Sequence, residues 1–219
     1  MRNVRVFFKK FAACKYISHL DLNRVMLRAL GKSGVDIWRT EGFNRHAYIT
    51  FALPLSLGFS SECESMDFRL LDDETDLSEI PERLNAGLPE GIRVFACHEA
   101  VHKPADIDAA RYEAELASDD ISVEELYIAL AQLLESEEIP VEKKTKKGFK
   151  TVNLKEYVRA CSLTAGESTV TLSITLPAGS STNINPTLFV TALEKRLGAE
   201  IYYDISRKEI YTKEGEPFA

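Results

Sequence analysis

The chain has 219 residues, of which 45% are hydrophobic and 28% are charged, and its formal net charge is −7. This composition is typical of a folded globular protein and excludes a mainly disordered chain. No stretch approaches the ~20 apolar residues of a membrane span, and the opening sequence MRNVRVFFKK lacks the apolar core of a secretory signal. We therefore expect a cytoplasmic protein that has no membrane partner.

The charge is divided unevenly among three segments of the chain. Residues 1–50 carry a net charge of +7, residues 51–142 carry −18 and residues 143–219 carry +4. Because nucleic-acid binding depends on the local field, the acidic total does not exclude it. A solvated acidic face on two helices would explain the middle segment equally well.

The first half of the chain shows the order strand, helix, strand, strand, helix, strand, with one additional short strand. Alternating apolar residues predict strands over residues 4–16, 35–39, 48–53, 62–71 and 92–98. Ser18, followed three residues later by Asp21, predicts the start of a helix over residues 18–30. A second helix is predicted over residues 77–88.

The same order of elements recurs after the polar, proline-containing segment 99–110. Strands are predicted over residues 111–117, 154–163, 168–177 and 201–211, with one more beginning at residue 139. Ser122 and Glu125 form a capping-box pattern at the start of a helix. Pro186 is expected at the first position of the last helix, which Gly198 ends.

The repeated order of elements predicts the fold. We expect an α+β protein with two tandem ferredoxin-like (β-α-β-β-α-β) domains that have antiparallel sheets, residues 1–104 and residues 105–219. Each sheet would carry two helices on one face and leave its other face open to a ligand or to the other domain.

Common cofactor motifs are absent from the sequence. It contains no GxGxxG, Walker P-loop or G-x-S-x-G pattern. The cysteines, at positions 14, 63, 97 and 161, form no C-x-x-C pair, so a zinc ribbon or an iron–sulfur cluster is not expected. We expect no metal and no cofactor, and we expect the cysteines to be small buried hydrophobes.

Two histidines lie in polar segments that could carry chemistry. His19 falls in the first turn of the first helix, where the helix dipole favours neutral imidazole, and His46 follows a Gly-Phe-Asn loop. Such a pair could perform general acid–base catalysis on an RNA 2′-hydroxyl. Alternatively, His19 caps or packs against its helix and His46 binds its own loop. A metal site that adds Glu62 and Glu64 rests on residue type alone.

Basic residues interleaved with aromatic ones suit single-stranded RNA, because phosphates pair with charge and bases stack. In the first half the candidate RNA-binding residues are Arg24, Arg28, Arg39, Phe43, Asn44 and Arg45. In the second half they are Lys143, Lys144, Lys146, Lys147, Phe149 and Lys150. A solvated loop, or pairing with neighbouring acidic residues, remains the alternative for the lysine cluster.

Three segments carry a resemblance to a known family: residues 16–22 (YISHLDL), residues 42–46 (GFNRH) and residues 53–58 (LPLSLG) with the following Glu62. Together they resemble the bacterial radical SAM-linked protein family, a domain of unknown function that occurs alone or fused to radical SAM proteins. Its genes often lie near genes for ribosomes and RNA processing. Arg45 and Ala47 stand where the family's usual pattern, GFNPHP, has prolines. The resemblance implies work on RNA or the ribosome.

The sequence as a whole predicts an RNA-binding accessory module, for ribosomal or transfer RNA, that works with a separate radical SAM enzyme in RNA processing or modification. We do not expect catalytic activity of its own. Two alternatives stay open. One is a metal-independent RNA-cleaving or RNA-modifying enzyme that uses His19 and His46, and the other is a protein-interaction adaptor with an acidic surface.

Overall fold

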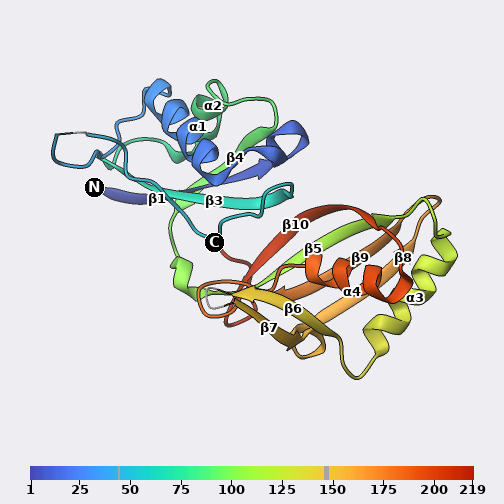
Figure 1. Ribbon diagram of the computed structural model, residues 1–219. Helices are drawn as coiled ribbons and strands as arrows, with labels where there is room; N and C mark the ends of the chain where they lie inside the picture. The colour runs from blue at the N-terminus through green and yellow to red at the C-terminus, as the bar shows by residue number, and fades with distance from the viewer. Residues whose placement is uncertain (44, 146–147) are drawn as a thin grey trace. The chain divides into compact units, whose positions relative to one another are not determined.

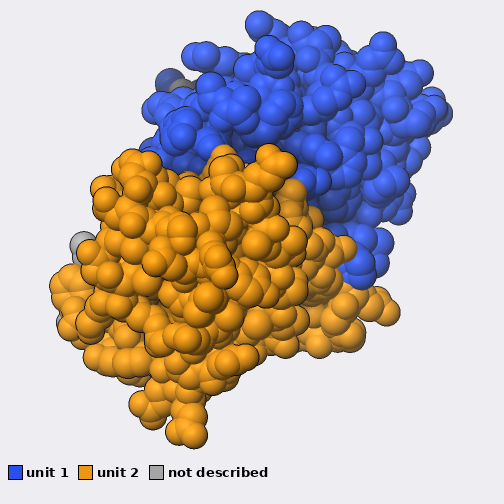
Figure 2. Space-filling model, turned by 90° about the vertical axis from the view of Figure 1, so that its right-hand side faces the viewer, with its two compact units in different colours: residues 1–107, 217–219 blue, residues 108–216 orange. Residues whose placement is uncertain are grey.

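The computed structural model describes residues 1–43, 45–145 and 148–219, and it divides into two compact units (Figures 1 and 2). Unit 1 comprises residues 1–107 and 217–219, and unit 2 comprises residues 108–216. The last three residues therefore cluster with the N-terminal part of the chain. No helix in the described part of the chain has both the length and the apolar composition needed to cross a bilayer.

Unit 1 contains strands and helices in the order that the sequence predicts. Its strands are β1 (Arg2–Lys10), β2 (Thr50–Phe51), β3 (Ser60–Leu70) and β4 (Ile92–Glu99). Its helices are α1 (His19–Lys32) and α2 (Ile80–Asn85), with short 3-10 helices η1 (Ala12–Tyr16), η2 (Leu77–Glu79) and η3 (Pro104–Asp106). Within the unit the strand order is β4-β1-β3, with β2 added to β3, and these pairs are antiparallel.

The core of unit 1 lies between its sheet and its two helices, which cover the same face (Figure 1). Alternation along β1 directs Val4, Val6 and Phe8 into this core. On α1 the buried residues Leu22, Met26, Ala29 and Leu30 recur at helical spacing. The helix begins as predicted, because the Ser18 side chain accepts a hydrogen bond from the Asp21 N–H.

Three predicted strands of unit 1 are shorter in the structure. β1 ends at Lys10, because Ala12 adopts a positive φ of 48° and a 3-10 helix follows. Residues 35–39 contribute only isolated bridges, from Ile37 to Leu70 and from Arg39 to Ala47. The strand predicted over residues 48–53 is reduced to β2, and the proline at position 54 has no N–H with which to extend it.

Unit 2 also contains one main sheet and two helices. Its strands are β5 (Ile107–Ala117), β6 (Pro140–Thr145), β7 (Gly148–Asn153), β8 (Ala160–Ala165), β9 (Val170–Pro177) and β10 (Tyr202–Thr212). Its helices are α3 (Val123–Glu135) and α4 (Thr187–Leu197), with the 3-10 helix η4 (Leu154–Tyr157). The strand order in the main sheet is β10-β5-β9-β8, and β9 is antiparallel to both its neighbours.

The main departure from the prediction in unit 2 is a separate hairpin. The strand expected from residue 139 pairs with β7 rather than with the main sheet. The strand expected over residues 154–163 begins instead with η4. Asn153 explains this turn, because its side-chain oxygen accepts hydrogen bonds from the N–H groups of Ile139 and Lys155. The main sheet therefore takes its fourth strand from β8.

The helix signals of unit 2 are largely confirmed. Ser122 and Glu125 form both hydrogen bonds of the capping box at the start of α3. Gly198 ends α4 with a φ of 67°, a conformation that strains other residues. Pro186 lies one position earlier than predicted, because it is the N-cap of α4.

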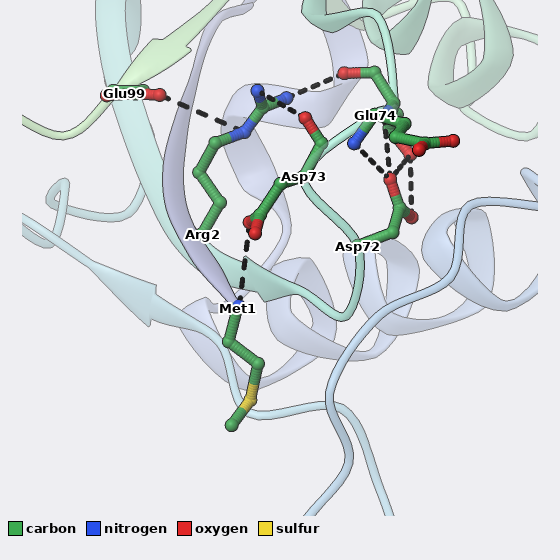
Figure 3. Close-up of polar contacts among 7 residues, drawn as sticks. Met1, Arg2, Asp72, Asp73, Glu74 and Glu99 are labelled. Carbon is green, nitrogen blue, oxygen red and sulfur yellow. Dashed lines mark hydrogen bonds and ion pairs between the residues drawn. The ribbon is translucent and has the colours of Figure 1, made fainter.

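The loop after β3 is closed by its own hydrogen bonds and tied to β1 (Figure 3). One carboxylate oxygen of Asp72 accepts from the N–H groups of Glu74 and Thr75, at 2.9 and 2.6 Å. Bonds from the Thr75 hydroxyl and backbone hold the pKa of the Asp72 carboxyl below its ordinary value. Arg2 donates to the carbonyl oxygens of Asp73 and Thr75, at 3.3 and 2.6 Å.

A buried arginine lies on the face of the unit 1 sheet that the helices leave open. Arg5 is fully buried, and its guanidinium donates to both carboxylate oxygens of Asp67, at 2.7 and 2.8 Å. It also donates to the carbonyl oxygens of His102 and Ala219, each at 2.8 Å. The Phe218 ring stacks on the guanidinium at 4.2 Å. Arg5 thus joins β1, β3, the segment after β4 and residues 217–219.

We expect Arg5→Met to lower the free energy of unfolding by about 3 kcal/mol, because removing one partner of a buried ion pair leaves the other charge uncompensated. Urea denaturation followed by circular dichroism measures this change. The matched control is Arg93→Met, which removes an exposed arginine from β4 and should change the free energy by less than about 0.5 kcal/mol. Equal effects of the two substitutions would contradict the role assigned to Arg5.

Candidate nucleic-acid interface

His19 is the first residue of α1 and is exposed. Its ring lies edge-to-face on Phe51, with the ring centroids 5.0 Å apart. Phe51 in turn contacts the buried ring of Phe8, at 6.2 Å. His19 therefore covers the outer edge of the unit 1 core with one side of its ring.

His46 contacts the loop that precedes it. Its ring Nδ1 lies 3.2 Å from the hydroxyl of Thr40, and the backbone N–H of His46 donates to the same hydroxyl. The carbonyl oxygen of His46 accepts from the Thr40 N–H at 2.8 Å. These contacts agree with the loop-binding alternative for His46. A catalytic pairing of His19 with His46 stays a prediction.

The two glutamates considered as metal ligands have different surroundings. Glu62 lies 3.6 Å from the Lys9 ammonium group, and Glu64 is buried. In the part of the chain that the structure describes, no group of three or more His, Cys, Asp or Glu side chains could hold a metal ion.

Arg24 and Arg28 lie exposed on α1, one turn apart. Arg24 forms an ion pair with Asp21 at 2.9 Å. Hydrogen bonds from the Ser18 hydroxyl and from Arg24 hold the pKa of Asp21 below its ordinary value. Arg24 therefore has an intramolecular partner, whereas no described residue forms an ion pair with Arg28.

The structure brings Arg39 and Arg45 together in one pocket of about 510 Å³, which we call the arginine pocket. Trp38 lines the same pocket, as do the carboxylates Asp36 and Glu41. Neither arginine forms an ion pair with a residue that the structure describes. Two predicted phosphate ligands thus converge beside an aromatic ring.

The remaining candidates of unit 1 lie in the loop that carries Arg45. Phe43 is fully exposed, so its ring contributes nothing to the core. Asn44 lies outside the described residues.

The lysine cluster lies on the hairpin of β6 and β7. Lys143 and Lys150 are directly opposite in the register, and Lys144 is opposite Phe149. The Lys143 ammonium donates to the carbonyl oxygen of Asn183 at 2.7 Å. Phe149 is 72% exposed. The other two candidates of this cluster, Lys146 and Lys147, lie outside the described residues.

A second pocket of unit 1, of about 360 Å³, was not predicted from the sequence. We call it the β3 pocket, and its lining includes Tyr48, Arg69 and Lys103. Its residues come from β1, β2, β3 and the segments flanking β2 and β4, and no linear motif marks them. The antiparallel register, which sets Asn3 opposite Arg69, brings these segments together.

The model of a family described as an uncharacterized protein conserved in bacteria, DUF2344, matches residues 3–186. The chain belongs to this family. The matched region includes both pockets and the hairpin, and it ends just before α4. No curated protein matches the chain. A crystal structure of an unknown protein from Galdieria sulphuraria is 15% identical over 93% of this chain and 98% of that chain, but the TM-score of 0.27 does not establish a shared fold.

The cysteines differ in burial, contrary to the expectation that all would be buried. Cys97 is buried in the unit 1 core, and this burial raises the pKa of its thiol to about 12. Cys161 is exposed on β8. Cys14 and Cys63 are half-buried.

We expect a thiol reagent at about pH 8 to modify Cys161 rapidly and to leave Cys97 unmodified while the protein is folded, because the thiolate is the reactive form. Mass spectrometry of peptides from a time course measures both rates. Because the pKa of Cys97 is raised, its protection should persist as the pH rises further into the alkaline range. Adding denaturant is the control, since it should make the two rates equal. Equal rates in the folded protein would contradict the burial of Cys97.

Proposed function

We propose that the protein is an RNA-binding accessory module for ribosomal or transfer RNA. The observation that carries this proposal is the pairing of Lys143 with Lys150 across the hairpin. Like charges directly opposite each other on neighbouring strands are destabilising. No described residue forms an ion pair with Lys150. A phosphate backbone would neutralise both charges, whereas a hairpin selected for stability alone would carry opposite charges here.

Phe149 supports the same proposal. Its side chain is 72% exposed and lies in the strand position next to Lys150. An exposed phenylalanine gains little from burial, so folding stability does not explain it. Bases of single-stranded nucleic acid stack on aromatic rings of this kind, while neighbouring cations contact the backbone.

The root of the hairpin is anchored in the core of unit 2. Ile139, Val141 and Leu154 are all buried, and β6 contacts α4. The lysine cluster therefore extends from a strand pair whose base is packed into the core of unit 2. An anchored strand pair loses less conformational freedom on binding RNA than an unstructured lysine-rich tail does.

In unit 1 the arginine pocket would supply further phosphate contacts. The planar guanidinium groups of Arg39 and Arg45 match the geometry of phosphate oxygens. Trp38 and the exposed ring of Phe43 lie in the same stretch of chain. This grouping of cationic and aromatic side chains supports single-stranded RNA rather than a regular duplex.

We also infer that each unit is a variant of the ferredoxin-like fold. The support is the strand order β4-β1-β3-β2 in unit 1 and β10-β5-β9-β8 in unit 2, combined with the β-α-β-β-α-β order of elements. Unit 2 differs by the insertion of the β6–β7 hairpin between α3 and β8.

The proposed partner is a separate radical SAM enzyme, to which the module would present bound RNA. The support is the resemblance of residues 16–22, 42–46 and 53–58 to the radical SAM-linked family. Sedimentation of the purified protein with a purified radical SAM enzyme, in the presence and absence of RNA, tests this partnership. If the two proteins do not co-sediment in the presence of RNA or in its absence, the partnership is overturned.

Lys150→Glu should stabilise the protein while weakening RNA binding. The substitution replaces a like-charge pair by an opposite-charge pair with Lys143, and we expect about 0.2–1 kcal/mol of added stability. Loss of one phosphate contact should reduce the slope of log K against log salt concentration by about 0.7. Thermal denaturation and binding to total cellular RNA at several salt concentrations measure the two effects.

The matched control for this experiment is Lys213→Glu, which makes the same change of charge at an exposed position of unit 2. It should leave the salt slope unchanged. No RNA binding by the native protein at low salt would overturn the proposed function. Equal losses in the two variants would show that the total charge, and not the hairpin, determines binding.

A further inference from the structure

We propose that the β3 pocket binds a nucleotide, with the base on Tyr48 and the phosphate between Arg69 and Lys103. The ligand is either a free nucleotide or one nucleotide of an RNA strand, which share this chemistry. The inference goes beyond the proposed function, because the pocket lies in unit 1 and does not involve the lysine hairpin.

Tyr48 provides a surface on which a base can stack. The side chain is 55% exposed and lines the pocket. Its ring contacts Trp38 edge-to-face, with the centroids 6.3 Å apart and the planes at 72°. Trp38 therefore supports one edge of the tyrosine, while its exposed surface stays available to a planar ligand.

Arg69 is held beside the same pair of rings. Its guanidinium carbon lies 5.6 Å from the centroid of the Trp38 ring, a cation–π contact. No described residue forms an ion pair with Arg69 or with Lys103. Both side chains are exposed, and both line the pocket. The pocket therefore presents two cations whose charge is not neutralised by a carboxylate.

The carboxylate in the pocket lining belongs to Asp67, and it does not oppose an anion there. Both of its oxygens accept hydrogen bonds from Arg5, at 2.7 and 2.8 Å. This buried guanidinium compensates the charge of Asp67. The remaining field in the pocket is set by Arg69 and Lys103, and it favours a phosphate.

The size and lining of the pocket narrow the class of ligand. A volume of about 360 Å³ is near the lower end of ligand pockets, so it suits one nucleotide rather than a dinucleotide. Most of the lining is apolar, and Asn3 and Thr50 add an amide and a hydroxyl. These groups can form hydrogen bonds with the edge of a base.

Trp38 makes the proposal directly measurable. It is the single tryptophan of the chain, and it contacts both Tyr48 and Arg69. We expect AMP or UMP to change its fluorescence in a saturable titration. Adenosine and inorganic phosphate each offer half of the interactions, and both should bind more weakly than AMP. Isothermal titration calorimetry checks the same affinities without relying on fluorescence.

Two substitutions test the two halves of the site. Tyr48→Leu should weaken AMP binding about fivefold or more, the lower end of the loss expected for one stacking aromatic. Lys103→Gln should weaken AMP and phosphate binding but not adenosine binding. The matched controls are Tyr203→Leu, a tyrosine of unit 2 with similar exposure, and Lys32→Gln, an exposed lysine at the end of α1. Circular dichroism verifies that each variant is folded.

Absence of both a fluorescence change and a heat signal with AMP and UMP would overturn the inference. Undiminished binding by Tyr48→Leu and Lys103→Gln would overturn it as well. An oligouridylate that displaces UMP would support the site and identify RNA as the source of the nucleotide. If UMP binds and the oligouridylate does not displace it, the result would support the site as one for a free nucleotide. Lys150→Glu should bind UMP normally, so failure of the hairpin proposal is distinguishable from failure of this one.

Discussion

Arg5 carries a positive charge on a side chain that is fully buried, and the desolvation of such a charge is costly unless it is fully paired. The guanidinium donates four hydrogen bonds that compensate it, two to the Asp67 carboxylate and two to backbone carbonyl oxygens. The carbonyl groups belong to His102 and Ala219, which are distant in sequence. Burial of one side chain therefore requires β1, β3 and two further segments to be in place together. This requirement explains why residues 217–219 belong to unit 1.

The same interaction determines the chemistry of the β3 pocket. Asp67 and His102 both line the pocket, and Arg5 binds both of them. Without Arg5, the Asp67 carboxylate would cancel part of the positive field of Arg69 and Lys103. The buried ion pair thus supplies structural support for the pocket wall and also removes a negative charge from the proposed binding site.

Local signals in the sequence predicted the elements well, because caps and alternation act over a few residues. Ser18 with Asp21 and Ser122 with Glu125 marked the starts of α1 and α3 correctly. The separate pairing of β6 with β7 was not predicted, because the turn that ends β7 depends on the Asn153 side chain, whose oxygen accepts hydrogen bonds from backbone N–H groups at the start of η4 and before β6. Hydrophobic periodicity carries no information about such a bond.

The site was less predictable than the fold, because it depends on which strands pair and in what register. Arg39 and Arg45 were identified from composition, and the structure does bring them into one pocket. Arg69 and Lys103 lie in the acidic middle segment of the chain, whose net charge is −18. They were therefore not identified from the sequence as candidate phosphate ligands. Only the pairing of β1 with β3 places Arg69 beside Asn3 and the segment after β4.

Two arginines on the unit 1 sheet have different partners, and the difference distinguishes a residue required for folding from one available for binding. Arg5 is opposite Asp67, and Arg69 lies two residues further along β3, on the same face. Arg5 has a carboxylate and two carbonyl oxygens as acceptors, whereas the guanidinium of Arg69 lies against the ring of Trp38. Folding stability accounts for the first arginine but leaves the hydrogen-bond donors of the second to solvent. An anionic ligand is the partner that would satisfy them, and in this respect Arg69 resembles the opposed lysines of the hairpin, whose mutual repulsion an anion would also relieve.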